Sequence, residues 1–373
     1  MKTFDPTQHP HRRFNILTRE WVICSPHRNN RPWQGQTETE EPKQLSSYDP
    51  KCYLCPGNTR ASGHRTPNYQ STFFFENDFA AVNETEVKYD EPKQPNPLNS
   101  FLRRIEPVRG KCYVICFHPR HDLTMADLEP EQILSIIKTW TELYKKIPID
   151  YPFIKYIKIF ENKGSMMGCS NPHPHGQIWA LSHIPTIPSK IIESQEDFAN
   201  SDTAVPGHAR MEDGRPSLLL AYAQSELNPI PSQRVIHQNK CFVALVPFWA
   251  VWPFEVIILP YKRHYPSLAH LQEDDQLDLA NIIAHVTSTY DKLFQCSFPY
   301  SMAINQAPVN TSASAAQLHL SFSPPLLRSA TVRKFLVGFE LFGEAQRDLT
   351  PELAAERLRS AALNPHCKSS SSS

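Results

Sequence analysis

Hydrophobic residues recur at helical spacing in two long segments of the chain. Residues 131–146 and 274–294 each place apolar side chains three or four positions apart, so that these side chains share one face of a helix. They are Ile133, Ile136, Ile137, Trp140, Leu143 and Tyr144 in the first segment, and Leu279, Ile282, Ile283, Val286, Tyr290 and Leu293 in the second. The pattern predicts a core-packed helix in each segment. A third helix is expected to begin at Thr350, because Pro351 is favoured in a first helical turn.

The most apolar stretch of the chain, residues 241–261, reads CFVALVPFWAVWPFEVIILPY. Pro247, Pro253 and Glu255 divide it into two short apolar runs, whereas a membrane-spanning helix needs about 20 consecutive apolar residues. The pattern therefore predicts two buried strands joined by a turn, and it argues against a membrane span.

A weak internal repeat links the surroundings of the first two predicted helices. VICFHPRHDLTMADL (114–128) precedes one helix and VIILPYKRHYPSLAHL (256–271) precedes the other. His121 and His264 are each followed, at nearly equal distance, by a second histidine, His175 and His319. The repeat predicts a duplicated unit. Because the His-Pro-His sequence occurs in the first copy alone, the chemistry is expected there.

Composition adds several limits to this picture. The 373 residues are enough for one large domain or two fused units, and 34 prolines against 11 glycines predict many extended segments and loops, especially at 26–70 and 90–99. Lys+Arg and Asp+Glu both number 38, which argues against a protein that coats a polyanion. The first residues contain no apolar segment of the signal-peptide kind, so a cytoplasmic protein is expected. Nine cysteines without such a signal favour metal binding or buried thiols over disulfides.

Cys52 and Cys55 lie in the sequence CYLCPGN, where two intervening residues let a tight turn aim both sulfurs at one ion. Two ordinary thiols in a loop are the alternative. A structural zinc site needs about four ligands, and His121 and His173 are the preferred partners. Such a site would attach the proline-rich N-terminal loop to the first sheet.

The sequence NPHPHGQIW (171–179) places His173, His175 and Gln177 at alternate positions, so they share one face of an extended strand. If His173 binds the metal, His175 is left as a fixed imidazole that can attack phosphorus and form a covalent intermediate. Gln177 can hydrogen-bond an oxyanion but cannot transfer a proton. The group therefore suits a good leaving group such as a sugar phosphate.

The preceding loop, FENKGSMMGCSN (160–171), combines glycines with polar side chains and is a plausible phosphate cradle, although a plain connecting loop would also use glycines. Its candidate donors are Asn162, Ser165 and Ser170. Cys169 is a rival nucleophile without an evident activating partner, and is interpreted as a packed thiol. Two basic clusters could neutralise phosphate, with Arg28 and Arg31 in one and Arg328, Arg333 and Lys334 in the other.

Eight segments of the chain resemble the galactose-1-phosphate uridylyltransferase family of the histidine-triad superfamily, from about residue 9 to about residue 360. They are HPHRRFN, SPHRNNRPWQGQ, CYLCPGN, NDFAAV, FENKGSMMGCSNPHPHGQIWA, VPFWAVWPFEVIILP, SFPYSM and PPLLRSATVRKFLVGFE. The resemblance implies an α+β fold in which two histidine-triad-like halves form a mainly antiparallel sheet with flanking helices. The halves would span residues 1–195, with the zinc loop and the nucleophile, and 196–363, with hexose-phosphate contacts, before a disordered tail at 364–373.

The same resemblance implies a ping-pong reaction of galactose metabolism in a homodimer whose active sites draw on both subunits. UDP-glucose would give its uridylyl group to the nucleophile, and galactose 1-phosphate would take it up to form UDP-galactose. Carried over position by position, the nucleophile is His175, Gln177 and Ser170 contact the transferred phosphate, and Cys52, Cys55, His121 and His173 bind zinc. The nucleotide and its phosphates would contact Arg28, Arg31, Asn77, Asp78 and Asn162, and the hexose phosphate would contact Lys334, Glu340 and Gln346.

The chain departs from the family pattern at a second metal site, which some members form from a glutamate and three histidines. Asn305 and Ser321 stand at two histidine positions, His319 remains, and Glu193 is a doubtful glutamate equivalent. The second site is therefore predicted to be empty. Phe339 also stands where a tyrosine is common, which bears on hexose selectivity.

Three alternatives stay open at this stage. One is another nucleotidyltransferase or phosphorylase of the superfamily, for example one that acts on ADP-linked substrates. Another is a zinc-stabilised nucleotide-binding protein without turnover, against which the intact His175 and Gln177 argue. A histidine-triad nucleic-acid repair protein is disfavoured, because no basic stripe or aromatic platform is present.

Overall fold

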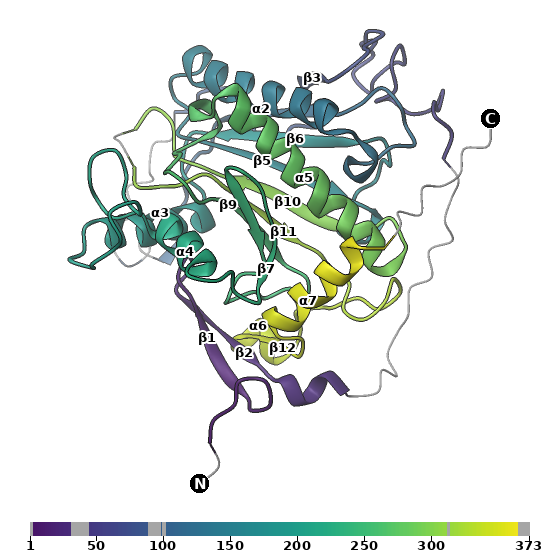
Figure 1. Cartoon of the computed structure of the whole chain (residues 1–373). Coiled ribbons are helices and arrows are strands. Elements are labelled where there is room, and N and C mark those ends of the chain that lie inside the picture. The colour runs from purple at the N-terminus through teal and green to yellow at the C-terminus, as the bar shows by residue number, and fades with distance from the viewer. Residues whose placement is uncertain (1–2, 31–44, 89–97, 99–101, 312–313, 365–373) are drawn as a thin grey trace.

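The structure is a computed structural model, and it describes residues 3–30, 45–88, 98, 102–311 and 314–364. Arg31, most of the loop expected at 90–99 and residues 365–373 of the expected tail lie outside this part of the chain. Figure 1 shows the two long helices lying against a large sheet, with the N-terminal hairpin at the opposite end of the molecule.

The centre of the molecule is a nine-stranded sheet in the order β3-β4-β6-β5-β10-β11-β9-β8-β7. Every neighbouring pair in it is antiparallel. The strands are β3 (Phe73–Glu76), β4 (Gly110–Cys116), β5 (Tyr156–Lys163), β6 (His175–Leu181), β7 (Val235–Gln238), β8 (Phe242–Leu245), β9 (Val256–Pro260), β10 (Tyr300–Asn305) and β11 (His319–Ser323). The α+β class with a mainly antiparallel sheet is thereby confirmed.

The helices confirm the two predicted from periodicity and the one predicted to begin at Thr350, and they add others. The α-helices are α2 (Pro130–Asp150), α3 (Thr186–Ala199), α4 (Leu218–Leu227), α5 (Glu273–Phe294), α6 (Phe339–Phe342) and α7 (Pro351–Ala362). Short 3₁₀ helices are η1 (Pro26–Asn30), η2 (Met125–Asp127), η3 (Ser165–Met167) and η4 (Leu268–His270). Thr350 caps α7 by accepting a hydrogen bond from the backbone N–H of Leu353 at 3.3 Å.

The apolar segment 241–261 forms strands β8 and β9, which pair antiparallel, as the two-strand prediction required. Within the described residues, no helix combines the length and apolarity that crossing a bilayer requires.

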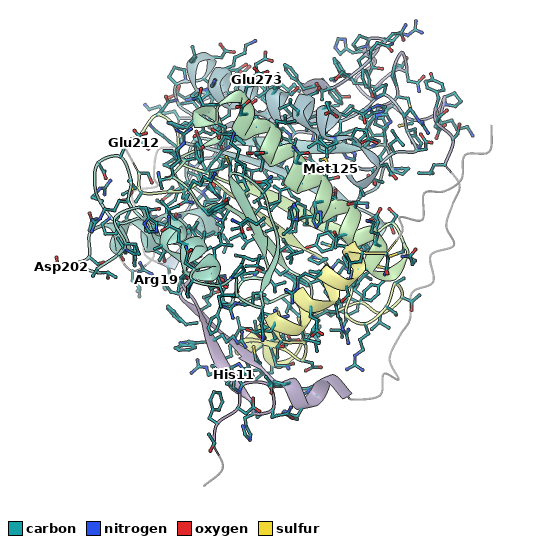
Figure 2. All side chains as sticks on the ribbon, viewed as in Figure 1. His11, Arg19, Met125, Asp202, Glu212 and Glu273 are labelled. Carbon is teal, nitrogen blue, oxygen red and sulfur yellow. The ribbon has the colours of Figure 1, made fainter. Side chains whose placement is uncertain are left out.

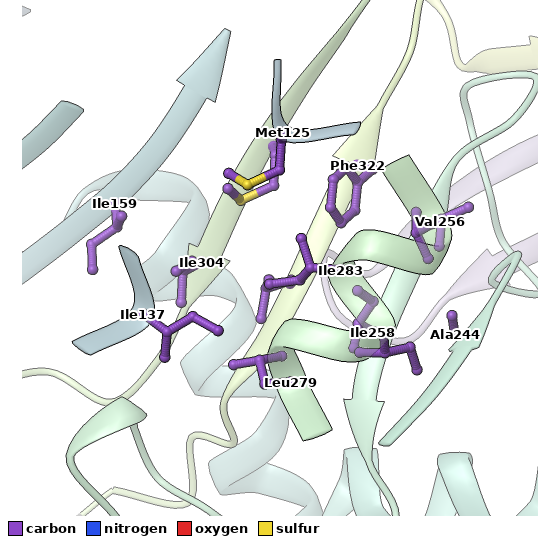
Figure 3. Packing of buried hydrophobic residues seen from close by; sticks show 14 of the residues in the cluster. Met125, Ile137, Ile159, Ala244, Val256, Ile258, Leu279, Ile283, Ile304 and Phe322 are labelled. Atoms are coloured by element: carbon purple, nitrogen blue, oxygen red, sulfur yellow. The ribbon is translucent and has the colours of Figure 1, made fainter. Parts of the chain in front are cut away.

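One face of the sheet carries the main hydrophobic core. Because strand side chains alternate, Ile159 and Ile304 point to the same face at paired positions on β5 and β10. They pack against Ile137 of α2 and Ile283 of α5, as Figure 3 shows. Each of these residues is almost fully buried, so truncation of any one to alanine is a core defect that typically costs roughly 2–5 kcal/mol.

The opposite face of the sheet is covered at its two sides and polar in the middle. At the β3–β4 side, Val114 and Cys116 pack against the loop that contains Cys52 and Cys55. At the β8–β9 side, an apolar cluster joins the sheet to α3 and α4. Between these two covers, β6, β5, β10 and β11 present a strip of polar side chains.

The strand order shows the internal repeat as a pseudo-two-fold arrangement. β5 and β10 pair at the centre, followed outward by β6 and β4 on one side and by β11 and β9 on the other. α2 and α5 are the corresponding helices and pack on each other. Since both halves contribute strands to one continuous sheet, their division at residue 195 stays a prediction.

A smaller sheet, β1-β2-β12, joins the two ends of the chain. β1 (His11–Asn15) pairs with β2 (Glu20–Cys24), and β12 (Ala345–Arg347) runs parallel to β2. Figure 2 shows His11 of this sheet far from Glu273, the first residue of α5.

A charged network attaches this small sheet to the body of the protein. Arg13, which is 4 % exposed, donates two hydrogen bonds to Glu352 of α7, at 2.9 and 3.1 Å. Arg234 donates to the same carboxylate at 2.8 Å and also pairs with Glu226. Burial alone would raise the pKa of Glu352, but these hydrogen bonds and the nearby charge of Arg13 lower it to about 2.

We expect this network to make the protein lose stability in acid. Because the pKa of Glu352 lies below its unfolded value of 4.5, the stabilisation is complete above pH 4.5 and is lost as the pH falls toward 2. Its full size is roughly 3 kcal/mol. Glu352→Gln should therefore unfold at lower urea concentration than the wild type at pH 7, with a smaller difference at pH 3. Glu356→Gln, at an exposed position of the same helix, is the control. Equal denaturation midpoints for Glu352→Gln and the wild type at pH 7 would contradict the expectation.

Candidate active site and metal centre

Four buried side chains from distant parts of the sequence meet beside the first half of the sheet. The ligand atoms of Cys52, Cys55, His121 and His173 all lie within 4.8 Å of one another. The sulfur of Cys55 is 3.6 Å from Nδ1 of His121 and 3.5 Å from Nδ1 of His173. Two sulfurs and two imidazoles are a ligand set of structural zinc sites. The structure thus brings together the four residues predicted as metal ligands.

Hydrogen bonds around this cluster set the protonation that a metal ligand needs. The hydroxyl of Tyr69 donates its one proton to the carbonyl of Leu54 at 2.6 Å, so it accepts from Nε2–H of His173 at 2.8 Å. Nδ1 of His173 is then the unprotonated nitrogen, and it is the one that faces Cys55. The Asn171 amide oxygen accepts from the backbone N–H of His173, while its NH2 group lies 3.4 Å from the sulfur of Cys52. Tyr69 and Asn171 therefore orient the cluster from outside.

Burial keeps His173 and Cys55 in their neutral forms when no ion is bound. It lowers the pKa of His173 to about 3 and raises the pKa of Cys55 to about 12. The Cys55 thiol would have to release its proton when a cation binds, which couples metal binding to pH.

His175, the first residue of β6, is held next to this cluster. Its Nδ1 is 2.7 Å from the carbonyl oxygen of His173. Since a carbonyl can only accept, Nδ1 carries the proton and Nε2 keeps its lone pair. Burial lowers the pKa of His175, so the ring is neutral near pH 7. The result is an imidazole with a fixed tautomer and one nucleophilic nitrogen.

His175 lines a small pocket at the end of the polar strip. The other lining residues are Phe160, Asn162, Gly168, Cys169, Ser170, Gly176 and Gln177. Gly176 faces the opposite side of the strand, where a Cβ would lie 2.7 Å from the ring of Phe117 and 2.9 Å from the carbonyl oxygen of Phe160. Only glycine fits between His175 and Gln177, because the strand is packed tightly on the core.

Two amide side chains, those of Gln177 and Asn162, line this pocket. In each, a neighbouring side chain donates a hydrogen bond to the amide oxygen. The indole N–H of Trp179 donates to Oε1 of Gln177 at 3.1 Å. The hydroxyl of Ser301 donates to Oδ1 of Asn162 at 2.7 Å. Both NH2 groups therefore remain available to phosphate oxygens.

The glycine-containing loop before β6 supplies Ser170 to the same pocket. Gly164 and Gly168 adopt positive φ values of 88° and 77°, which only glycine tolerates without strain. The Cys169 thiol donates to the carbonyl of Asn171 at 3.1 Å, and burial raises its pKa. A protonated, hydrogen-bonded thiol agrees with its interpretation as a packed residue.

The three predicted hexose-phosphate contacts form a separate cluster near the small sheet. Nζ of Lys334 donates to Oε1 of Glu340 at 2.5 Å and to the carbonyl of Gln346 at 2.7 Å. The Gln346 amide donates to Asp348, which pairs with Arg28 at 3.5 Å. The structure therefore groups Lys334, Glu340, Gln346 and Arg28, but none of them lines the pocket of His175.

Asn77 and Asp78 follow strand β3 at the edge of the sheet. The Asn77 side chain accepts from the backbone N–H of Phe79, and Asp78 pairs with Arg60 at 3.4 Å. Neither residue lines the pocket of His175.

Three positions of the family's second metal site lie together on β10 and β11, but their chemistry does not suit a metal. Asn305 and His319 are paired across β10 and β11, and the Asn305 NH2 group donates to the hydroxyl of Ser321 at 3.3 Å. Glu193 is exposed and accepts from Ser189 on its own helix. One imidazole among amides and a hydroxyl, without a carboxylate, is a poor ligand set for a transition metal.

The contact of Tyr69 with His173 and the contact of Trp179 with Gln177 were not predicted from the sequence. Trp179 continues the alternation of His175 and Gln177, so its contact with Gln177 could have been anticipated from strand geometry. Tyr69 carried no signal, because its contact with His173 depends on how the metal loop folds back.

Comparisons with known proteins agree with this geometry. Residues 2–185 match the family described as "Galactose-1-phosphate uridyl transferase, N-terminal domain", and residues 198–371 match its C-terminal domain. The chain is 46 % identical to "Galactose-1-phosphate uridylyltransferase" of Hypocrea jecorina, with 94 % of each chain covered. It is 45 % identical to the protein of that name from Haemophilus influenzae, with 95 % of each covered.

Among solved structures, one titled "Structure of uridylyltransferase" superposes with a TM-score of 0.68 at 25 % identity, covering 95 % of this chain and 98 % of that one. An ADP-glucose phosphorylase from Arabidopsis thaliana also has a TM-score of 0.68, at 23 % identity, and covers 94 % of this chain and 99 % of its own. The second likeness concerns the fold alone. With both family domains matched and nearly half of the residues shared with full-length relatives, the chain belongs to the galactose-1-phosphate uridylyltransferase family.

Proposed function

We propose that this protein transfers the uridylyl group of UDP-glucose to galactose 1-phosphate, releasing glucose 1-phosphate and UDP-galactose. The observation that carries the proposal is the state of His175: a neutral imidazole with Nδ1–H bonded to the carbonyl of His173 and Nε2 available in the pocket. Family membership supports the choice of substrates.

The reaction proceeds in two displacements at the α-phosphorus. Nε2 of His175 attacks, the bond to the glucose 1-phosphate oxygen breaks, and a phosphoramidate forms. A phosphate oxygen of galactose 1-phosphate then attacks the same phosphorus and restores the imidazole. The amides of Asn162 and Gln177 and the hydroxyl of Ser170 donate to the phosphate oxygens during both steps. No side-chain acid is needed, because a sugar phosphate is a good leaving group.

We assign zinc to the cluster of Cys52, Cys55, His121 and His173, with a structural role. When bound, zinc would join the loop of the two cysteines to the sheet and hold His173 in place. The carbonyl of His173 fixes the tautomer of His175. By holding His173 in place, the metal would therefore also stabilise the orientation of the nucleophile.

The remaining substrate contacts are assigned by the family resemblance. Arg28, Arg31, Asn77 and Asp78 would bind the nucleotide and its phosphates, and Lys334, Glu340 and Gln346 would bind the hexose phosphate. The described residues among them do not line the pocket of His175. The proposal therefore includes a homodimer in which each active site combines residues of two subunits.

A mass measurement tests the proposed reaction. Incubation with UDP-glucose and no acceptor is expected to add the mass of one uridylyl group to the intact protein, on a peptide that contains His175. Addition of galactose 1-phosphate should remove this mass and release UDP-galactose. If UDP-glucose binds without forming an adduct, the chain is a nucleotide-binding protein. An adduct from ADP-glucose alone would instead indicate a phosphorylase-like enzyme.

A further inference from the structure

The second half of the sheet contains a buried polar cluster that mirrors the active site. His319 begins β11 as His175 begins β6, and each bonds through Nδ1 to the carbonyl two residues before it, at 2.8 and 2.7 Å. Asn305 of β10 corresponds to Asn162 of β5 across the pseudo-two-fold axis. Ser301 donates to Oδ1 of Asn162, whereas Lys158 donates to Oδ1 of Asn305 at 2.5 Å.

Lys158 belongs to the same sheet face as the active-site residues. It precedes Phe160 and Asn162 at alternate positions of β5, so its side chain enters the polar strip beside His319. Within the described residues, no carboxylate is paired with its ammonium group. Burial lowers the pKa of Lys158 to about 8, which leaves the ammonium as the main form at neutral pH.

We propose that the ammonium group of Lys158 is a built-in cation that replaces the second metal ion of other family members. A divalent ion with one glutamate contributes a net charge of +1, and one lysine among neutral amides contributes the same. Gln195, from α3, lines the same cavity as Asn305 and His319, and its amide oxygen accepts from the backbone N–H of Gln317 at 3.0 Å.

The hydrogen bonds of the cluster favour a lysine over a metal. The amide oxygen of Asn305 accepts a hydrogen bond from Lys158, and its NH2 group donates to Ser321. The amide is therefore not available as a metal ligand. The one imidazole nitrogen left is Nε2 of His319, which is buried and makes no hydrogen bond among the described residues. Burial lowers the pKa of His319 to about 4, so this ring stays neutral beside the lysine.

The role that we assign to Lys158 is to join the two halves of the sheet. Its bond to Asn305 connects β5 with β10, the central pair of the pseudo-two-fold arrangement. Two residues farther along β5, Phe160 lines the pocket of His175. A metal would make such a connection through several ligands. The lysine makes it through its hydrogen bond to Asn305 and does not depend on metal supply.

Metal content measured by elemental analysis tests the proposal without reference to catalysis. Three proteins would be incubated with excess zinc or iron(II) and desalted: the wild type, a double variant and a triple variant. The double variant is Asn305→His/Ser321→His, and the triple variant adds Lys158→Gln. The triple variant should bind one more metal ion per chain than the wild type. Its three imidazoles, from His319 and the two introduced histidines, would surround the position that the Lys158 ammonium occupied. The double variant should match the wild type, since the retained ammonium repels a cation.

Three results would overturn the proposal: a second ion in the wild type, a second ion in the double variant, or a folded triple variant without one. The comparison is between variants, so it holds whether or not the site of Cys52 is loaded. If the triple variant fails to fold, the melting temperatures of single variants test the proposal instead. Lys158→Gln should melt several degrees below the wild type. Lys155→Gln should not, because the Lys155 ammonium makes a solvent-exposed hydrogen bond to the carbonyl of Asn310. Equal melting of Lys158→Gln and the wild type would count against the proposal.

Discussion

Replacement of His175 by alanine is expected to reduce uridylyl transfer by at least about 10⁴-fold, because no other side chain in the pocket offers an unprotonated, fixed nucleophile. The loss should appear in both half-reactions, and no covalent adduct should form with UDP-glucose. His175 makes its hydrogen bond to a backbone carbonyl at the start of β6, so its removal should leave the core intact. Equilibrium unfolding in urea and the rate of sugar-phosphate exchange measure the two effects separately.

Cys169→Ala is the matched control for this experiment, since Cys169 lines the same pocket and was the rival nucleophile. Its thiol is protonated and bonded to the carbonyl of Asn171, so its loss should change the rate by less than about tenfold. If His175→Ala retained exchange and Cys169→Ala lost it, the assignment of the nucleophile would be reversed.

Substitution of Cys52 by serine is expected to remove the bound metal and to lower the free energy of unfolding by at least about 3 kcal/mol. The cluster is buried, and the apolar group around it is small, with Leu54, Tyr69, Val114 and Cys116 as its buried members besides the two cysteine ligands. Without the ion, the loop of Cys52 and Cys55 has little apolar surface to keep it on β4. Elemental analysis and urea denaturation, with and without a chelator, would measure the effect.

Cys112→Ser separates loss of metal from the cost of burying a hydroxyl group. Cys112 is fully buried on β4 but contributes no atom to the cluster. We expect it to keep the metal and to lose less stability than Cys52→Ser. A Cys52→Ser protein with unchanged metal content and normal unfolding would refute the metal role. The transfer rate should fall with metal loss as well, because His173 then holds the tautomer of His175 less firmly.

Much of the candidate site was accessible from local spacing. His173, His175 and Gln177 were expected on one face because strand geometry repeats every two residues. β6 gives that geometry to His175 and Gln177, whereas His173 lies in the bend before the strand. The two long helices followed from their apolar periodicity in the same way. α3 and α4 were missed, because their surroundings are rich in proline and polar residues and their burial depends on the far side of the sheet.

The sequence by itself determined the spacing of the thiols, the alternation of polar side chains at the start of β6 and the duplication of the chain, because each of these is local or repeats along the backbone. Tertiary structure alone decided which groups those residues meet. The hydrogen bond with Tyr69 sets the tautomer of His173, and the hydrogen bond from Trp179 orients the Gln177 amide. Lys158 donates a hydrogen bond to Asn305 across the centre of the sheet. The contacts of Tyr69 and Lys158 join residues about a hundred positions or more apart, so they arise only when the core brings the strands and the metal loop together.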